Sequence, residues 1–470
     1  MPLTRVLRLR DLILLIIGAV VGSGIFLVPA TVLRQVGGRP SLALLAWAAG
    51  GVLSLLGALT YGELSAQHPQ PGGLYVYLRD CFGRLPAFLY GWTLFFVLCS
   101  GSVAALSVAF STYLAHLVPL SGAWLKLVSV GMIFAVTVVN VRGTRQSSDL
   151  QNWTTALKLF ALTAISVALL WFGRSAGDTS GVVRASTVSL LSGFGVAMVS
   201  VLWAYEGWQY CTFSAGETRN PQKNFPRAFL IGTTVLIGVY VLANLGYFAA
   251  LGTRAANSHS VAADASAAVL GATAAKIVSI AILVSTLSAA NSFILTSTRV
   301  FYAMAADGIF FRRLADIHPR FNTPALAVIA GSAWSIVLAA TGTFEQLLTY
   351  VVFSGWIFYG LGAACVFVYR RKLRHGTRPY SVPGYPIVPI VFIAAAAGIV
   401  VNTILAEPLR AAFGVLIIAA GVPAFAIWSS HRQGNGSDVS CSAAFQKPQV
   451  IPENKNRTYI AHHRSLQDEQ

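Results

Sequence analysis

Long apolar segments dominate this chain and limit its possible folds more than any other feature. Twelve of them are long enough to cross a bilayer, whose hydrocarbon core needs about 20 apolar residues of helix. Helices are the structure that satisfies so long an apolar backbone in lipid. We therefore predict an all-α polytopic membrane protein with twelve transmembrane helices, near residues 11–34, 41–65, 85–118, 124–141, 152–173, 190–213, 226–251, 271–300, 324–340, 345–369, 385–404 and 410–428.

The composition excludes several other classes of protein. Apolar residues make up 56% of the chain and charged residues only 10%, whereas a soluble domain carries about 25% charged residues. So few charges cannot cover the surface of a cytosolic enzyme, and neither a disordered chain nor a secreted disulfide scaffold has this composition. The five cysteines show no CxxC spacing, and we predict neither a metal site nor a cofactor.

The basic residues predict the orientation of the chain. The net charge of +17 suits either anionic partners or a membrane topology, and the cations form no soluble basic domain, so we favour topology and predict no nucleic-acid partner. With the N-terminus inside, the inside segments hold 19 Lys and Arg and the outside segments hold 8. The positive-inside rule then places residues 1–10 and the polar tail 431–470, which we predict to be disordered, in the cytoplasm.

Two of the predicted spans are interrupted near their middle. The first contains Gly22-Ser23-Gly24, and the sixth contains Glu206-Gly207 among three aromatic residues. Glycine-interrupted spans at corresponding places in two halves point to a transporter site at the membrane midplane. The halves would be residues 11–173 (spans 1–5) and 190–369 (spans 6–10), followed by spans 11 and 12 at 385–428. The alternative is that Gly-Ser-Gly is a small-residue packing surface between helices.

The interrupted segments suit a zwitterionic ligand. Open amides at Ser23, Gly24 and Ile25 stand at the positive end of a half-helix and favour a carboxylate. Unpaired carbonyls near Val20, Trp203 and Glu206 favour an ammonium group. Two opposite dipolar ends a few ångströms apart match an α-amino acid.

A family resemblance follows from these segments and four others. The chain resembles amino-acid permeases of the amino acid–polyamine–organocation superfamily, closest to the L-type (light-chain) branch and its bacterial relatives. The resemblance covers about residues 10–430, and its motifs keep their order: GSGIF at 22–26, GALTYGEL at 57–64, PGGLYVY at 71–77, WAYEGW at 203–208, ETRNPQKNFP at 217–226 and ADG at 306–308.

The resemblance implies a fold, an activity and a set of site residues. It implies a five-plus-five inverted repeat with broken helices 1 and 6, alternating access, and a sodium-independent L-amino-acid permease, working as an exchanger, in a bacterial inner membrane. Substrate would lie between spans 1 and 6 and be contacted by spans 3, 8 and 10. The family's contacts fall on Val20, Ser23, Gly24, Ile25, Trp203, Ala204 and Glu206, with Trp203 also acting as an aromatic gate.

Two polar residues inside other spans have competing interpretations. Lys158 in the fifth span resembles a built-in replacement for a sodium ion that ties this span to the first and could also gate proton coupling; alternatively it snorkels to the cytoplasmic face. Asn291 in the eighth span either borders the substrate cavity or bonds another helix.

Glu206 discriminates best between substrates. Its carboxylate could pair with a cationic substrate side chain, could be a protonatable coupling group, or could bond Trp208, Gln209 or neighbouring backbone. Some relatives that take dibasic amino acids carry an acidic residue here, whereas relatives restricted to large neutral substrates mostly carry a small one. The substrates would be neutral and possibly cationic.

Partners and rival functions complete the expectations. The loop 116–122 after the third span lacks the cysteine that holds the light chains to a glycoprotein, so we expect no covalent heavy subunit. The rivals are a proton-coupled cationic amino-acid symporter and a non-transporting amino-acid sensor; an enzyme is not expected, because the spans lack catalytic motifs. Acidic residues at cytoplasmic span ends (Glu63, Glu217, Asp307) either pair with Arg79, Arg219 or Arg299 or are solvated, and we favour solvation.

Overall fold

The computed structural model describes residues 5–115, 117–173, 190–258, 260–321, 323–372 and 378–433. Residues 434–470, which hold most of the predicted tail, lie outside the described residues. Within the described ranges the regular structure is helical, apart from one isolated bridge between Leu7 and Thr218.

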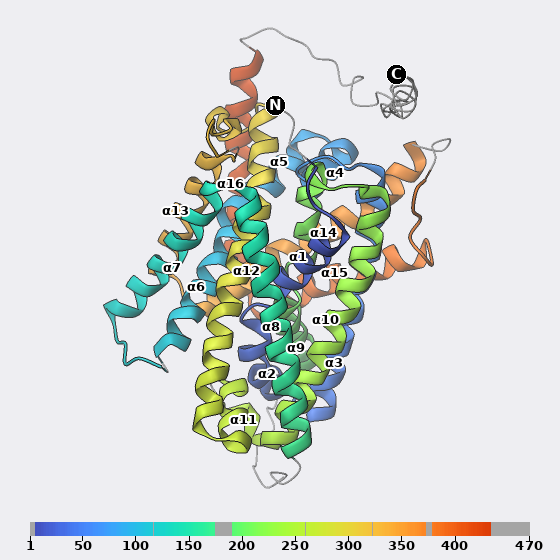
Figure 1. Cartoon of the computed structure of the whole chain (residues 1–470). Coiled ribbons are helices and arrows are strands. Elements are labelled where there is room, and N and C mark those ends of the chain that lie inside the picture. The colour runs from blue at the N-terminus through green and yellow to red at the C-terminus, as the bar shows by residue number, and fades with distance from the viewer. Residues whose placement is uncertain are drawn as a thin grey trace, which may run out of the picture. The chain divides into compact units, whose positions relative to one another are not determined.

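The described residues form sixteen α-helices, which follow one another along the chain (Figure 1). They are α1 Leu9–Val20, α2 Gly24–Gln35, α3 Pro40–Gln67, α4 Leu74–Phe82, α5 Arg84–Thr93, α6 Cys99–Ala115, α7 Ala123–Arg142, α8 Thr144–Phe172, α9 Leu190–Ala204, α10 Pro221–Leu251, α11 Val261–Leu270, α12 Ala272–Ala306, α13 Ala325–Thr341, α14 Phe344–Lys372, α15 Ile387–Ala406 and α16 Pro408–Gln433. A π-helical turn, Leu94–Leu98, joins α5 to α6, and a 3₁₀ segment, Trp208–Glu217, follows α9.

The helices confirm an all-α polytopic membrane protein. Among the described residues, nine helices are long and apolar enough to cross a membrane, and the bent pair α1 and α2 makes a tenth. The two remaining predicted spans contain α9 and α13, which have 15 and 17 residues and are too short to cross alone. The count of twelve and the inverted repeat therefore stay predictions.

The outer surface of the bundle suits lipid. Large apolar side chains that point away from the bundle include Trp153 and Trp171 on α8 and Leu405 on α15, each more than 70% exposed. Apolar side chains exposed to this extent over many helices fit a hydrocarbon environment rather than water.

The broken helices lie among the other helices rather than on the lipid face. α1 packs on α8, α10 and α12, and α2 packs on α9. α10 in turn packs on α3 and α8, so the segments around both interruptions are enclosed (Figure 1).

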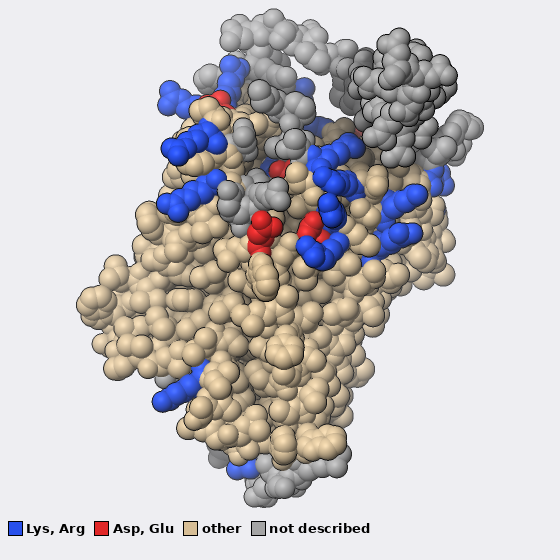
Figure 2. Space-filling view, in the orientation of Figure 1, with Lys and Arg blue, Asp and Glu red and all other residues tan. Residues whose placement is uncertain are grey.

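Charges gather at one end of the bundle. Figure 2 shows Lys and Arg concentrated at the end where the N-terminus lies in Figure 1, with few charges along the middle of this face. We call this the basic end. Arg312 and Arg313 after α12 and Arg371 and Lys372 at the end of α14 are exposed there.

Candidate substrate site

The first interruption separates α1 from α2. The regular hydrogen bonds of α1 end with the Val21 amide, which donates to the Ile17 carbonyl, whereas the Gly22 amide donates to Val20. α2 begins at Gly24, and the axes of the two helices are bent by 46°. Phe26 donates to the Ser23 carbonyl, and the Gly24 and Ile25 amides before it have no carbonyl of their own helix to bond. Ser23 precedes them, and its buried hydroxyl is without a hydrogen-bond partner among the described residues.

The second interruption follows α9. This helix ends at Ala204, and residues 205–207 form a turn before the 3₁₀ segment. Gly207 has a φ of 121°, a conformation that side chains disfavour. A Cβ at Gly207 would also come 3.1 Å from the Ala19 Cβ, so glycine is required here both for its conformation and for the close approach of α1.

The two interruptions lie directly against each other. A Cβ added to Gly24 would fall 2.6 Å from the Ala204 Cα, so the start of α2 touches the end of α9 backbone to backbone. The Tyr240 hydroxyl of α10 lies 2.9 Å from both the Val20 and the Ala204 carbonyl oxygens. One phenol from a third helix therefore shares its single proton between the carbonyls at the ends of both broken helices.

A small pocket lies between the interruptions. Its lining residues are Ala19, Val20, Gly22, Ser23, Gly24, Leu106, Trp203, Glu206 and Phe293. Five predicted site residues are thus brought together: Val20, Ser23, Gly24, Trp203 and Glu206. Ile25 and Ala204 are buried beside the pocket without lining it. Leu106 of α6 and Phe293 of α12 were missed by the sequence reasoning, although spans 3 and 8, which carry them, were expected to contact substrate.

Glu206 is buried at the pocket wall. Its Oε1 accepts hydrogen bonds from the Tyr359 hydroxyl at 2.5 Å and from Gln209 Nε2 at 2.7 Å. Tyr359 belongs to α14, the predicted tenth span, which therefore reaches the site through Glu206. The expected bonding to Gln209 is present, and Gln209 Oε1 is a buried acceptor without a partner among the described residues.

Lys158 of α8 reaches the first interruption from the side. Its side chain is 2% exposed, and Nζ donates to the carbonyls of Gly18 at 2.7 Å and Val21 at 2.6 Å. The Ser285 hydroxyl of α12 donates to Val21 at 3.0 Å. The ammonium thus lies among main-chain carbonyls, as a bound metal cation would, and does not snorkel to a surface.

Asn291 belongs to an interhelical network rather than to the pocket lining. Its Oδ1 accepts from Asn140 Nδ2 at 2.9 Å and from the Ser147 hydroxyl at 3.0 Å. Its Nδ2 donates to Gln151 Oε1 at 3.1 Å. This network joins α12 to α7 and α8, which is the second of the two interpretations weighed for Asn291.

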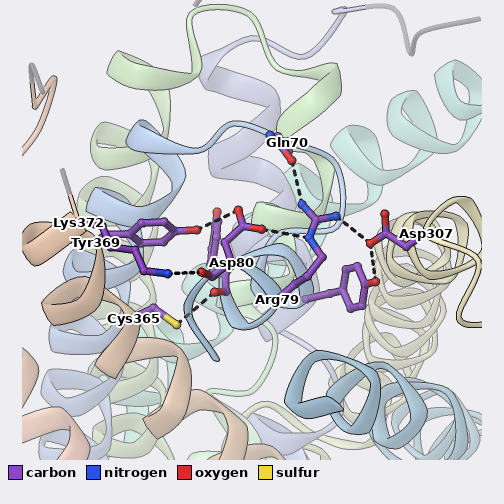
Figure 3. Close-up of polar contacts among 9 residues, drawn as sticks. Gln70, Arg79, Asp80, Asp307, Cys365, Tyr369 and Lys372 are labelled. Atoms are coloured by element: carbon purple, nitrogen blue, oxygen red, sulfur yellow. Dashed lines mark hydrogen bonds and ion pairs between the residues drawn. The ribbon is translucent and has the colours of Figure 1, made fainter. Parts of the chain in front are cut away.

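The basic end is closed by ionic contacts. Arg79 of α4 pairs with Asp307 at 2.7 Å, and Tyr75 donates to the same carboxylate at 2.6 Å (Figure 3). Arg79 also contacts Asp80 at 3.0 Å. Lys372 of α14 donates to the main-chain carbonyl of Asp80 at 2.8 Å, so these contacts join α4 to α12 and α14.

Two further pairs show that the favoured expectation of solvated span ends is wrong. Glu217 pairs with Arg299 at 3.2 Å, and both side chains are 5% exposed. Glu63 accepts two hydrogen bonds from Arg370, at 2.8 and 2.7 Å. Glu63 also accepts from the Val382 amide at 2.7 Å. Carboxylates this deeply buried need such partners, because an unpaired buried charge costs several kcal/mol.

Comparison with known proteins identifies relatives of the chain. A family model described as amino acid permease matches residues 7–427. The chain is 31% identical to the serine/threonine exchanger SteT of Bacillus subtilis (strain 168) over 87% of its own length and 94% of that protein. It is 30% identical to the human b(0,+)-type amino acid transporter 1, over 91% and 88% of the two chains. It is also 30% identical to the human cystine/glutamate transporter, over 88% and 84%.

The family match covers nearly all of the described helices, including both interruptions. The relatives are transporters or exchangers of amino acids and not enzymes, and the apolar helices make this chain an integral membrane protein. The chain therefore belongs to the amino acid permease family of the amino acid–polyamine–organocation superfamily, near its L-type transporter branch.

Proposed function

We propose that this protein exchanges L-α-amino acids across a bacterial inner membrane and binds them as zwitterions between the two interruptions. One observation carries the proposal: the amide-bearing start of α2 abuts the end of α9 beside a pocket lined by Ser23, whose buried hydroxyl lacks a partner. The substrate carboxylate would bind the Ser23, Gly24 and Ile25 amides, and the ammonium would bind carbonyls at Val20, Trp203 and Glu206.

Sodium independence is supported by Lys158. Its ammonium lies beside the Gly18 and Val21 carbonyls at the first interruption. Without it, a transported cation would be needed to balance the partial negative charge of these carbonyls. A fixed positive charge supplies that balance in every cycle, so no sodium gradient is required.

The substrate range depends on Glu206. Because its carboxylate lines the pocket and Tyr359 and Gln209 bond one of its oxygens, it can also accept from a donor on the substrate side chain. This favours neutral substrates together with cationic ones. The second candidate, a proton-coupled symporter of cationic amino acids, is favoured by the same buried carboxylate, which could carry the proton.

The topology is proposed together with the function. Twelve spans, formed by an inverted repeat of five plus five and two more helices, would place the basic end in the cytoplasm. The ion pairs of Arg79, Arg299 and Arg370 would then close the cytoplasmic side, and Trp203 would gate the opposite side. We propose that the protein works without a covalently attached heavy subunit.

The test measures exchange by the purified full chain in liposomes preloaded with one amino acid. Gly24→Val places branched carbon atoms against Ala204 and is expected to abolish uptake of labelled alanine, leucine and arginine. Gly131→Val is the matched control, because Gly131 lies on α7 with open space around it. Undiminished exchange by Gly24→Val, or no uptake by the wild type with or without a proton gradient, would refute the proposal. Binding without uptake would support the sensor.

Glu206→Gln separates the substrate interpretations. Hydrogen bonds to charged groups contribute about 1.5–3 kcal/mol, so arginine uptake should fall about 10- to 150-fold while alanine and leucine uptake changes little. Equal losses for all three amino acids would instead assign Glu206 to the scaffold or to proton coupling. A sodium gradient should leave wild-type uptake unchanged.

A further inference from the structure

A second cavity lies at the end of the bundle opposite the basic end. Its volume is about 380 Å³, within the range of about 300–1,000 Å³ that small-molecule sites occupy. Its walls come from α2, α9, α14, α15 and the start of α16. We call it the outer cavity.

The outer cavity begins one helical turn beyond the substrate pocket. Leu27 and Val28 of α2 line it, three and four residues after Gly24. Val199 and Ser200 of α9 also line it, four and three residues before Trp203. At 1.5 Å per residue the cavity extends about 10 Å along α2, from residue 27 to residue 34. A solute that approaches Trp203 from this end therefore passes beside the outer cavity.

Charged groups of both signs line the outer cavity. Arg34 donates to the Ala256 carbonyl at 2.5 Å and to the Thr31 hydroxyl at 2.9 Å. Arg410 lies 3.6 Å from Glu407 and 3.4 Å from the Thr349 hydroxyl. A guanidinium has five N–H donors, so these contacts leave donors on both arginines for an anion.

An uncharged donor adds to this set. Asn402 of α15 lines the outer cavity, and its buried Nδ2 has no hydrogen-bond partner among the described residues. A Cβ at Gly195 would come 2.7 Å from Asn402 Oδ1, so a glycine on α9 allows this amide to sit against the neighbouring helix. Asn402 is therefore packed into the wall, whereas Arg34, Arg410 and Glu407 stand at the more exposed rim of the cavity.

We propose that the outer cavity is a second binding site for a zwitterionic α-amino acid, which waits there before it enters or after it leaves the central pocket. Arg34 and Arg410 bind the carboxylate and Glu407 binds the ammonium group. This inference rests on the proposed function for the identity of the ligand. Glu407 favours a zwitterion over a lipid phosphate, because a second negative charge on the rim opposes a purely anionic headgroup.

The test measures protection of a reporter cysteine in the outer cavity. Val199→Cys is introduced together with Gly24→Val, so that the central pocket cannot bind, and the full chain is placed in phosphatidylcholine nanodiscs. A methanethiosulfonate reagent then labels the cysteine with and without L-alanine or L-leucine. The same chain without Val199→Cys gives the background from the native cysteines.

The expected result is slower labelling with either amino acid, by about two-fold when the ligand concentration equals its Kd. L-alaninamide, which lacks the carboxylate, should not slow labelling. Protection should be lost in Arg34→Gln/Arg410→Gln, partly kept in Arg410→Lys, and fully kept in Lys276→Gln, which removes an exposed cation at the same end of the bundle. Monodisperse elution of each variant shows that it is folded.

Three results would overturn the outer site: no slowing at any concentration, equal slowing by the amide, or slowing that appears only when phosphatidylglycerol is added to the nanodiscs. The last result would assign the arginines to a lipid phosphate. Exchange in liposomes is read separately. Undiminished exchange by Gly24→Val would refute the central site without affecting the protection result. Conversely, absent protection together with normal exchange would refute the outer site alone.

Discussion

Replacing Lys158 with methionine tests how the first interruption is held open. In an unbroken helix the amide of residue 22 would bond the carbonyl of Gly18, but here Gly22 donates to Val20. The Lys158 ammonium takes the place of that amide at Gly18 and also bonds Val21. Lys158→Met keeps an unbranched side chain that is one atom shorter, and it removes both donated hydrogen bonds.

The size of the effect follows from the partners left behind. A buried carbonyl without a partner costs about 1–3 kcal/mol. Gly18 loses its donor, while Val21 keeps the hydrogen bond from Ser285, so the sum is about 2–4 kcal/mol. The buried ammonium carries a desolvation cost that the variant no longer bears, which moves the net loss toward about 2 kcal/mol. We expect exchange to fall about 30-fold or more.

The assay is exchange in preloaded liposomes, corrected for the amount of folded protein. Lys126→Met, which changes an exposed lysine on α7, is the matched control. Ser285→Ala removes the hydroxyl that donates to the Val21 carbonyl at 3.0 Å and to the Gly22 carbonyl at 3.3 Å. These contacts share one proton, so the change should cost about 0.5–1.5 kcal/mol, a loss of about 2- to 10-fold. If Lys158→Met exchanges within two-fold of the wild type, the ammonium does not hold the interruption open.

Two further predictions concern the basic end. Asp307→Asn weakens the contacts with Arg79 and Tyr75 by about 1 kcal/mol, so deuterium uptake by α4 should rise about 5-fold. The control Asp316→Asn changes an exposed residue and should leave deuterium uptake unchanged. Unchanged deuterium uptake by α4 in Asp307→Asn would show that these contacts do not hold α4 at the basic end. Burial lowers the pKa of His68, against the opposing effect of Asp80, so protonation favours the unfolded state and the melting temperature should fall as the pH drops below about 6.5. His68→Gln should reduce this fall; an equal fall in the variant assigns the pH dependence to other groups.

The sequence predicted most of the helices, because long apolar runs and glycine clusters are local signals. Helix ends were less accurate where charges continue a helix. α12 runs to Ala306 rather than to residue 300, because Arg299, paired with Glu217, stays buried and helical and the uncharged residues 301–306 continue the helix as far as Asp307. α10 begins at Pro221 rather than at residue 226: Pro221 stands in the first turn, where proline fits, and Pro226 lies inside the helix.

The site was predictable only where its residues stand on the interrupted segments. Ser23, Gly24 and Glu206 carry a local signal, but Tyr240 and Tyr359 are tyrosines in ordinary spans, and their roles depend on which helices pack together. The sequence signal for these two residues was a tyrosine near the middle of an apolar span, because its hydroxyl needs a hydrogen-bond partner at membrane depth. The pairing of acidic span ends was weighed but not favoured, and Arg370 was missed as the partner of Glu63 for the same reason: the two residues are 307 apart in the chain.

The supports of the two interruptions suggest how a moving site could keep its geometry. Lys158 and Tyr240 bond main-chain carbonyls rather than side chains, so they hold the ends of the half-helices while leaving the dihedral angles of the interruption free to change. Because the Tyr240 hydroxyl contacts the ends of both α1 and α9, a rotation that displaces Val20 also displaces Ala204. The two interruptions therefore keep their relative position. Under the proposed function, opening the basic end requires its ion pairs to separate. Since Arg79 and Asp307 are partly exposed, water can replace their contact at a cost of about 1 kcal/mol, whereas the enclosed pair of Glu217 and Arg299 would set the larger part of the barrier.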